Sequence, residues 1–250
     1  MTAETHNDDE HIALLTYASR QIPERSWVFT GFNWPMLAAR AARRMGRRFT
    51  ELYEAGAAVD QASEQLPSST TDYASYADAL AWHGTTLDVF GLIPRVSAVL
   101  LDASRVDVHG RLSTFGDGFS PGPRGRSAGG GGSADAAARA GNLILVHASA
   151  RPDAITLDST HPTAVPNPSA TVHIVTRWGT LLVQPETQLL EVTDTQRGRA
   201  FASHLATLGV SVEGATMTVP PTQVEQEAAQ AVLSEARSRG YRGAGHRGAP

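Results

Sequence analysis

The chain has 250 residues, of which 41% are hydrophobic and 18% are charged, and its formal net charge at pH 7 is −4. It contains no cysteine, and all 21 of its basic residues are arginine, which excludes disulfides, thiolate chemistry, a Schiff-base lysine and a phosphate-binding GK[ST] loop. The length can bury a substantial core, and the slight acidity gives no sign of nucleic-acid binding. The N-terminus "MTAETHNDDEHIALL" is acidic, and no apolar run approaches the ~18 residues of a membrane span. We therefore expect a cytoplasmic protein that binds neither nucleic acid nor a membrane.

The spacing of apolar residues predicts strands that alternate with helices. In the first helix, Ile12, Leu15, Ala18 and Ile22 recur at helical spacing behind acidic residues. The expected elements are a helix over 8–22, a strand over 27–30, a helix over 33–45, a strand over 50–54, a helix over 73–83, strands over 97–103, 142–148, 171–176 and 180–184, and helices over 197–208 and 223–239. This alternation predicts an α/β fold with an open, mainly parallel sheet flanked by helices.

We divide the chain into an α/β domain over 1–220 and a C-terminal segment over 221–250. The C-terminal segment consists of the last helix and a tail, "GYRGAGHRGAP", that we expect to be disordered.

The predicted helix over 33–45 has clear signals at both ends. Asn33 can cap it, and Pro35 fits only in its first turn. Five arginines cluster at the C-terminal end of this helix: Arg40, Arg43, Arg44, Arg47 and Arg48. Cations are favourable there because the C-terminus is the negative end of the helix dipole. Such a cluster is more typical of a solvated helix end than of a site for an acidic ligand.

Glu54 is a candidate reactive carboxylate, because it stands at the predicted carboxyl end of a strand in "FTELYEAGAAVD". Ligands of open α/β sheets bind outside the carboxyl ends of the strands, and the small residues after Glu54 would let a bulky ligand approach. A structural or solvated glutamate at a strand end shows the same local pattern and is the commoner case. Glu51 is not a partner, since residues three apart on a strand point to opposite faces.

Four consecutive glycines, Gly129 to Gly132, lead through Ser133 and Asp135 into an alanine-rich helix. The run has two interpretations. It is either a flexible linker or a loop whose unobstructed backbone N–H groups hold an anion or an oxyanion at a helix N-terminus. The helix and buried strand that follow favour the ligand loop.

Other catalytic patterns are missing from the sequence. The nine histidines are dispersed, with no HxxxH or HxH spacing, so no metal site is predicted. No GxSxG nucleophile elbow occurs.

Four segments together resemble the β subunit of class I CoA-transferases of the glutaconate type. "VFTGFNWPMLAARAARR" resembles the glycine-bearing strand and following helix of that family. "LYEAGAA", followed by "LP" at 66–67, resembles the segment around its catalytic glutamate. "ASRVDVHGRLSTFGDG" and "GRSAGGGGSADAAARA" resemble two later family segments. The four lie in family order and cover roughly residues 10 to 185, and the steroid-ring-opening CoA hydrolase β subunits are similar as well.

The resemblance implies a covalent role for Glu54. In the family, the glutamate attacks an acyl-CoA thioester to give a mixed anhydride. The released CoA thiolate then forms a glutamyl-CoA thioester, which a second carboxylic acid resolves. The implied oxyanion or CoA contacts are Gly31, Ala55, Gly56, Gly129, Gly130, Gly131 and Gly132. CoA would be a substrate, with no permanently bound cofactor. The implied partner is a homologous α subunit in an α2β2 assembly, with the site between the subunits.

The sequence also departs from the family pattern. Asn33 replaces the second glycine near the first strand, and Val59 replaces a glycine five residues past Glu54, where it would crowd the loop. Arg105 and Arg111 replace a glutamine and an asparagine. These arginines fit either an acidic substrate or surface ion pairs. Three alternatives to a transferase stay open: a CoA-dependent hydrolase or carbon–carbon lyase, a biosynthetic acyl-transfer enzyme, and a non-catalytic subunit that completes a partner's pocket.

Overall fold

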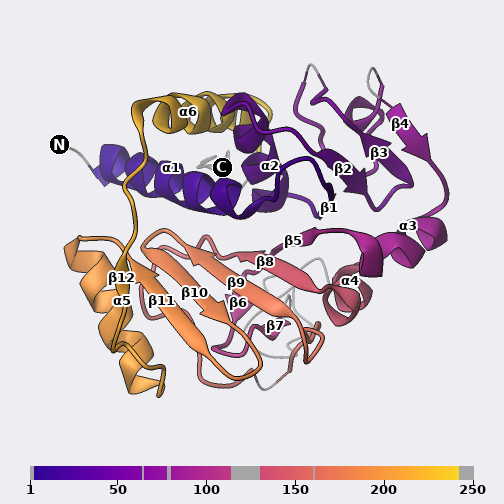
Figure 1. Ribbon diagram of the computed structural model, residues 1–250. Coiled ribbons are helices and arrows are strands. Elements are labelled where there is room, and N and C mark those ends of the chain that lie inside the picture. Colours follow the sequence, from indigo (N-terminus) through magenta and orange to yellow (C-terminus); the bar gives the residue numbers. More distant parts are fainter. Residues whose placement is uncertain (1–2, 64, 78–79, 114–129, 160, 242–250) are drawn as a thin grey trace, which may run out of the picture.

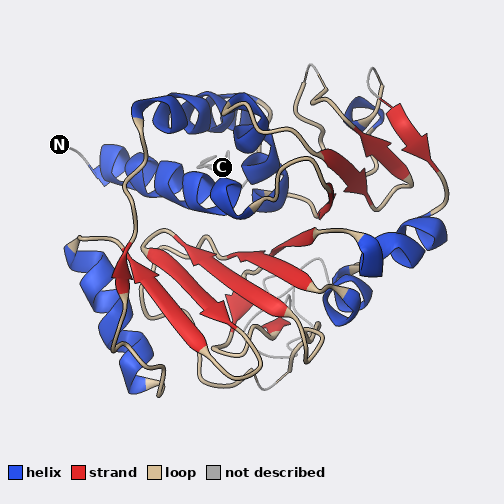
Figure 2. Ribbon diagram, in the orientation of Figure 1, coloured by secondary structure: helices blue, strands red, loops and turns tan. Residues whose placement is uncertain are grey.

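A ten-stranded mixed sheet runs through the protein, with helices on both of its faces (Figures 1 and 2). The computed structural model describes residues 3–63, 65–77, 80–113, 130–159 and 161–241. The α-helices are α1 (Ala3–Gln21), α2 (Trp34–Arg44), α3 (Thr86–Leu92), α4 (Ser133–Arg139), α5 (Gln196–Thr207) and α6 (Gln223–Ser238), and short 3₁₀ turns span Tyr73–Ser75 and Ile93–Arg95.

The strands follow the order β12-β11-β10-β9-β8-β5-β1-β2-β3-β4 across the sheet. Their bounds are β1 (Trp27–Thr30), β2 (Thr50–Tyr53), β3 (Ala57–Val59), β4 (Leu80–His83), β5 (Ala98–Asp102), β8 (Asn142–Val146), β9 (Thr171–Thr176), β10 (Gly179–Val183), β11 (Gln188–Val192) and β12 (Thr216–Met217), and a separate hairpin pairs β6 (Arg105–Val106) with β7 (Leu112–Ser113). The neighbours β9, β8, β5, β1 and β2 run parallel, and antiparallel strands extend the sheet at both ends. The α/β class with a parallel centre is therefore confirmed.

Each face of the parallel centre carries its own core, because successive residues of a strand point to opposite faces. On the first face, Val28, Leu100 and Ile144 pack with the helices α1, α2 and α6. On the second face, Phe29 and Val99 pack with α3, α4 and α5. Both faces of these strands are buried, which is why they read as continuous apolar runs in the sequence.

The helix α6 belongs to the same layer as α1 and α2 and packs against both of them (Figure 1). Its residues Ala229, Val232 and Leu233 are fully buried in this layer. The chain beyond α6 continues into the fold as far as Tyr241. The Tyr241 ring is buried against Phe32, and its hydroxyl donates to the backbone oxygen of Pro67. The remainder of the tail that we expected to be disordered, residues 242–250, lies outside the described residues.

One predicted element is wrong. The segment 73–83 was expected to be helical, but it forms a 3₁₀ turn over Tyr73–Ser75 and the edge strand β4 over Leu80–His83. Hydrogen bonding to β3 decides the second part, since Trp82 pairs with Ala58 and His83 pairs with Ala57. The other predicted strands and helices match observed elements to within a few residues at each end.

Candidate active site

The carboxyl ends of β1, β2 and β5 meet at one edge of the sheet and form a cavity there. In the register of the sheet, Phe29 of β1 lies beside Leu52 of β2 and Val99 of β5, so the residues just beyond these strands converge. They enclose a cavity of about 700 Å³. Its lining includes Gly31, Phe32, Asn33, Glu54, Ser68, Thr70, Asp102, Gly130, Gly131, Gly132, Ser133, Arg239 and Tyr241.

Glu54, the predicted catalytic residue, lines this cavity. It is the first residue after β2, in the turn that leads to β3, and its side chain is half-buried. Its carboxylate forms no hydrogen bond or ion pair within the described part of the chain. The turn depends on Gly56, which has a φ of +98° and whose N–H donates to the Tyr53 oxygen. A carboxylate without partners at a cavity wall is free to meet a ligand.

The glycine loop forms the part of the cavity wall next to Glu54. A β-carbon on Gly132 would lie 2.9 Å from Oε1 of Glu54 and 2.2 Å from the Phe90 ring, so the backbone can approach the carboxylate only as glycine. The N–H groups of Gly131 and Gly132 donate no backbone hydrogen bond among the described residues. The Ser133 hydroxyl is buried without a hydrogen-bond partner there. This wall therefore presents unused donors beside Glu54, whereas Gly129 lies outside the described residues.

Two of the remaining predicted contacts, Gly31 and Gly56, have backbone groups that are already hydrogen-bonded within the chain. Gly31 lines the cavity, but its N–H donates to the Leu100 oxygen at 2.9 Å. The backbone oxygen of Gly56 is also hydrogen-bonded, because it accepts from the Gly84 N–H at 2.8 Å. Ala55 is half-buried beside Glu54 and, like Gly56, is absent from the cavity lining.

Two polar residues that sequence reasoning did not connect with a site also line the cavity. Asp102 is the last residue of β5, and its Oδ2 accepts from Nδ2 of Asn33 at 2.5 Å. Removal from water raises the pKa of Asp102 to about 6, although the amide of Asn33 opposes the shift. The signal was present in "SAVLLDA", where an aspartate ends a buried apolar strand at the same sheet edge as Glu54.

We expected Asn33 to cap α2, but its side chain does not do so. It stands at the N-cap position but makes no side-chain capping bond. Its φ of 69° lies in the left-handed region, which costs a non-glycine residue of the order of 1–3 kcal/mol unless its surroundings enforce it. The amide that would have capped the helix is instead bonded to Asp102.

Glu51 has an environment unlike that of Glu54. Its side chain is 4% exposed, and its Oε2 lies 3.5 Å from Nε of Arg43. Burial raises the pKa of Glu51, and the charge of Arg43 partly offsets that rise. Val59 pairs with Glu51 in the sheet and packs with the α1–α2–α6 layer, so it does not crowd the cavity.

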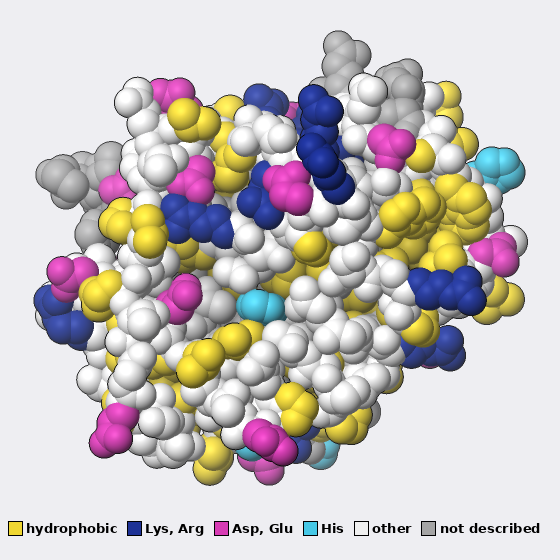
Figure 3. Space-filling view, in the orientation of Figure 1, with side chains coloured by type: hydrophobic (Ala, Val, Ile, Leu, Met, Phe, Trp, Pro, Cys, Tyr) yellow, Lys and Arg dark blue, Asp and Glu magenta, His cyan; other side chains and the backbone are white. Residues whose placement is uncertain are grey.

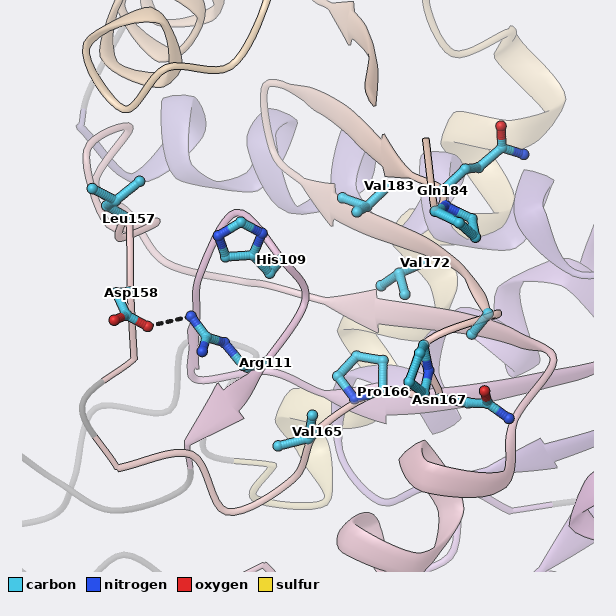
Figure 4. Close-up of a pocket in the computed structure, with 13 residues that line it drawn as sticks. His109, Arg111, Leu157, Asp158, Val165, Pro166, Asn167, Val172, Val183 and Gln184 are labelled. Atoms are coloured by element: carbon cyan, nitrogen blue, oxygen red, sulfur yellow. Dashed lines mark hydrogen bonds and ion pairs between the residues drawn. The ribbon is translucent and has the colours of Figure 1, made fainter. Parts of the chain in front are cut away.

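The family-like segment around Arg111 builds a second cavity, of about 560 Å³, elsewhere on the molecule (Figure 4). Arg111 bonds Asp107 at 2.7 Å and also pairs with Asp158. Asp107 is completely buried and accepts further bonds from the backbone N–H groups of His109, Arg111 and Ser159. Arg111 thus forms ion pairs that fix a loop, and neither Arg111 nor Arg105 lines the Glu54 cavity.

The described residues meet neither the requirements of a three-ligand metal site nor those of a membrane-spanning helix. Among the described residues, no group of three or more histidine, cysteine, aspartate or glutamate side chains is placed to hold a metal ion. No helix in the described part of the chain is long and apolar enough to cross a membrane.

Comparison with known proteins places the fold. No model of a known protein family matches the sequence, and no curated protein matches it. A variant of the decarboxylase AibA/AibB superposes with a TM-score of 0.70 and 23% identity, over 93% of this chain and 97% of that chain. Glutaconate coenzyme A-transferase from Acidaminococcus fermentans gives a TM-score of 0.70 at 14% identity, over 93% and 96% of the two chains. The acyl-CoA transferase YdiF from E. coli O157:H7 gives 0.52 at 12% identity, over 84% of this chain and 39% of that chain. The protein therefore has a class I CoA-transferase-like fold, as the sequence resemblance predicted.

Proposed function

We propose that this chain is the β subunit of a heteromeric CoA-transferase that moves CoA between an acyl-CoA and a carboxylic acid through a glutamyl-CoA thioester on Glu54. The observation that supports the proposal most directly is the carboxylate of Glu54. It has no partner among the described residues, lines a cavity of about 700 Å³ at the carboxyl ends of parallel strands, and faces Gly132. A carboxylate is a weak nucleophile but a reversible carrier of an acyl group.

The glycine loop supports the same chemistry. Attack of Glu54 on a thioester produces a tetrahedral intermediate whose oxygen carries negative charge. Preorganised donors stabilise such an oxyanion by ~3–4 kcal/mol each. The unused N–H groups of Gly131 and Gly132 and the Ser133 hydroxyl lie at the cavity wall and are suited to this task.

The comparisons support CoA as the substrate and a second subunit as the partner. The YdiF structure is a thioester complex with CoA, and this chain spans only 39% of the YdiF chain. The decarboxylase carries two component names, AibA and AibB. Hydrophobic side chains gather over the sheet edge formed by β2–β4 and over α3 (Figure 3), where Trp27, Leu80 and Leu87 are 37%, 47% and 83% exposed. A partner subunit would cover an apolar surface of this kind.

The test is covalent capture on the purified complex of this chain with its partner subunit. We expect acyl-CoA to convert Glu54 to its CoA thioester, which adds the mass of CoA less one water, and borohydride to reduce that thioester. Glu54→Gln should abolish both the adduct and CoA exchange. The matched control is Glu186→Gln, at an exposed glutamate outside the cavity, which should exchange CoA normally. Full exchange by the Glu54→Gln complex would overturn the proposal and would instead favour a non-catalytic subunit.

A further inference from the structure

The Asn33–Asp102 pair is a built feature of the Glu54 cavity for which CoA exchange has no use. Asn33 adopts a backbone conformation that ordinarily belongs to glycine, yet its side chain is directed to Oδ2 of Asp102 at 2.5 Å. A glycine here would be free of strain and would leave Asp102 without this hydrogen bond. The pair therefore holds one carboxyl group in a fixed orientation at the cavity wall.

Asp102 and Glu54 line the same cavity although they come from different strands. β1 lies between β2 and β5, Glu54 follows β2 directly, and Asp102 ends β5. The carboxyl ends of these parallel strands lie at one edge of the sheet, and the cavity at that edge is lined by both carboxyl groups. The other titratable groups on the cavity wall are Arg239 and Tyr241. The ring of His147, on the neighbouring strand end, is bonded through Nδ1 to the Ala103 oxygen at 2.6 Å.

The stoichiometry of the reaction indicates what a second carboxyl group can do there. CoA exchange between two carboxylates consumes and releases no proton, so an acid–base residue would be idle in it. Hydrolysis of a thioester does release a proton, and a base that accepts this proton from water accelerates the step. Enclosure raises the pKa of Asp102 to about 6, so its carboxylate form predominates at neutral pH.

We propose that Asp102 is a general base of the Glu54 cavity, that Asn33 positions it, and that the enzyme therefore also hydrolyses acyl-CoA. This inference rests on the proposed function. A water molecule in the cavity gives one proton to Asp102, and its oxygen bonds to the carbonyl carbon of the glutamyl-CoA thioester. The carbon–sulfur bond breaks, and CoA leaves as the thiol with the second proton of water. Glu54 is regenerated as a carboxylate, and Asp102 is left protonated until it loses its proton to solvent.

Thiol release measures this activity, and this chain adds no thiol background because it has no cysteine. The complex is given a panel of CoA thioesters with apolar, hydroxylated and acidic acyl groups. No carboxylate acceptor is added. We expect the wild type to release CoA at a rate that rises as the pH increases through about 6. Asp102→Asn should form the Glu54 adduct normally but release CoA at least tenfold more slowly, with partial rescue in Asp102→Glu. The control Asp194→Asn, at an exposed aspartate, should match the wild type.

The variant Asn33→Gly tests whether Asn33 positions Asp102 or only supports the fold. Glycine accepts the φ of 69° without strain, so the fold should be kept. Loss of the amide removes the hydrogen bond that lowers the pKa of Asp102, so the midpoint of the pH profile should move upward.

Two results would overturn the inference: CoA release by Asp102→Asn at the wild-type rate, or no release by the wild type from any member of the panel. Failure of the proposed function looks different. In that case no adduct forms on Glu54, while CoA release still depends on Asp102.

Discussion

A β-carbon on Gly132 would lie 2.9 Å from Oε1 of Glu54, so the backbone of the glycine loop is in close contact with the candidate nucleophile. This contact joins two segments that are 78 residues apart in the sequence. It also makes the geometry of the site sensitive to the smallest possible change of side chain.

We predict that Gly132→Ala impairs activity more than stability. The added methyl group would overlap the Phe90 ring at 2.2 Å and displace Glu54. Overpacking of this kind costs ~1–3 kcal/mol of stability, whereas a misplacement of about 1 Å can cost ~100-fold in rate. Acyl-CoA turnover and urea unfolding measure the two effects. Gly91→Ala, near the end of α3, is the control. A β-carbon on Gly91 would have nothing within 4 Å, so the turnover of this variant should not change.

A comparison of alanine variants at Gly46 and Gly56 distinguishes the cost of backbone strain from the cost of steric overlap. Both have positive φ values, +98° and +87°. A β-carbon on Gly46 would meet nothing within 4 Å, whereas one on Gly56 would lie 2.1 Å from the Gly84 oxygen. We expect Gly46→Ala to lower the free energy of unfolding by about 1 kcal/mol and Gly56→Ala to lower it by ~3 kcal/mol or more. Equal losses in chemical denaturation would show that the turn at Gly56 can relax.

His11 makes the stability depend on pH. Its ring is 2% exposed, lies 5.0 Å from the Trp34 ring between centroids, and has no hydrogen-bond partner on either nitrogen among the described residues. Burial, and secondarily the charge of Arg177, lowers the pKa of His11 from 6.5 to about 4. Between these values the unfolded chain binds a proton that the folded chain does not. The free energy of unfolding should therefore fall as the pH decreases from about 6.5 to about 4, by ~2–3 kcal/mol for this group.

The variant His11→Phe keeps a ring beside Trp34 and removes the titrating group. We expect the difference in unfolding free energy between pH 7 and pH 4.5 to shrink by ~2 kcal/mol relative to the wild type. The exposed His161 provides the comparison, since His161→Phe should leave that difference as it is. An unchanged pH dependence in His11→Phe would show that the pKa of His11 is the same in the folded and unfolded chains.

An ion pair between α1 and the start of α6 provides the opposite pH dependence. Arg20 donates from Nε and Nη2 to the two carboxylate oxygens of Glu225, each at 2.8 Å. Glu225 also bonds the N–H and hydroxyl of Thr222 in a capping box. The Arg20 hydrogen bond is the main cause that lowers the pKa of Glu225 to about 2. This stabilisation is fully present above pH 4.5 and is lost as the pH falls toward about 2.

Glu225→Gln should therefore lower the free energy of unfolding by ~1–2 kcal/mol at pH 7, after allowance for the partial exposure of both side chains. At pH 2 the difference from the wild type should largely vanish. Arg20→Lys tests the geometry, because an ammonium group cannot reproduce the two parallel hydrogen bonds. A lysine variant as stable as the wild type would show that charge alone accounts for the interaction.

Local patterns predicted most of the sheet because both faces of its central strands are buried. The strands 27–30, 142–146 and 171–176 appear as apolar runs of strand length, and they form β1, β8 and β9. The edge was harder to predict. The segment 73–83 carries no burial signal of its own, since Leu80, Ala81 and His83 are exposed, and its strand is defined by hydrogen bonds to β3.

The roles of the candidate site residues stay predictions, but the structure shows where these residues lie. Glu54 and the glycine run were recognised from the sequence, and Gly130 to Gly132 do line the cavity with Glu54. Gly31 was expected to contact an oxyanion or CoA, and its N–H is bonded to the Leu100 oxygen. That bond reaches across to the neighbouring strand β5, so no spacing within its own segment could reveal it.

Local periodicity, residue size and backbone freedom are enough to predict the α/β class, a carboxylate at the end of β2 and a glycine loop before a helix. They do not reveal that Asp102 belongs to the same cavity as Glu54 or that Asn33 is bonded to Asp102. These two residues are 69 positions apart, and the parallel pairing of β1 with β5 brings them together. The same contact explains why Asn33 tolerates a positive φ: the hydrogen bond to a carboxyl group enclosed by protein opposes the backbone strain.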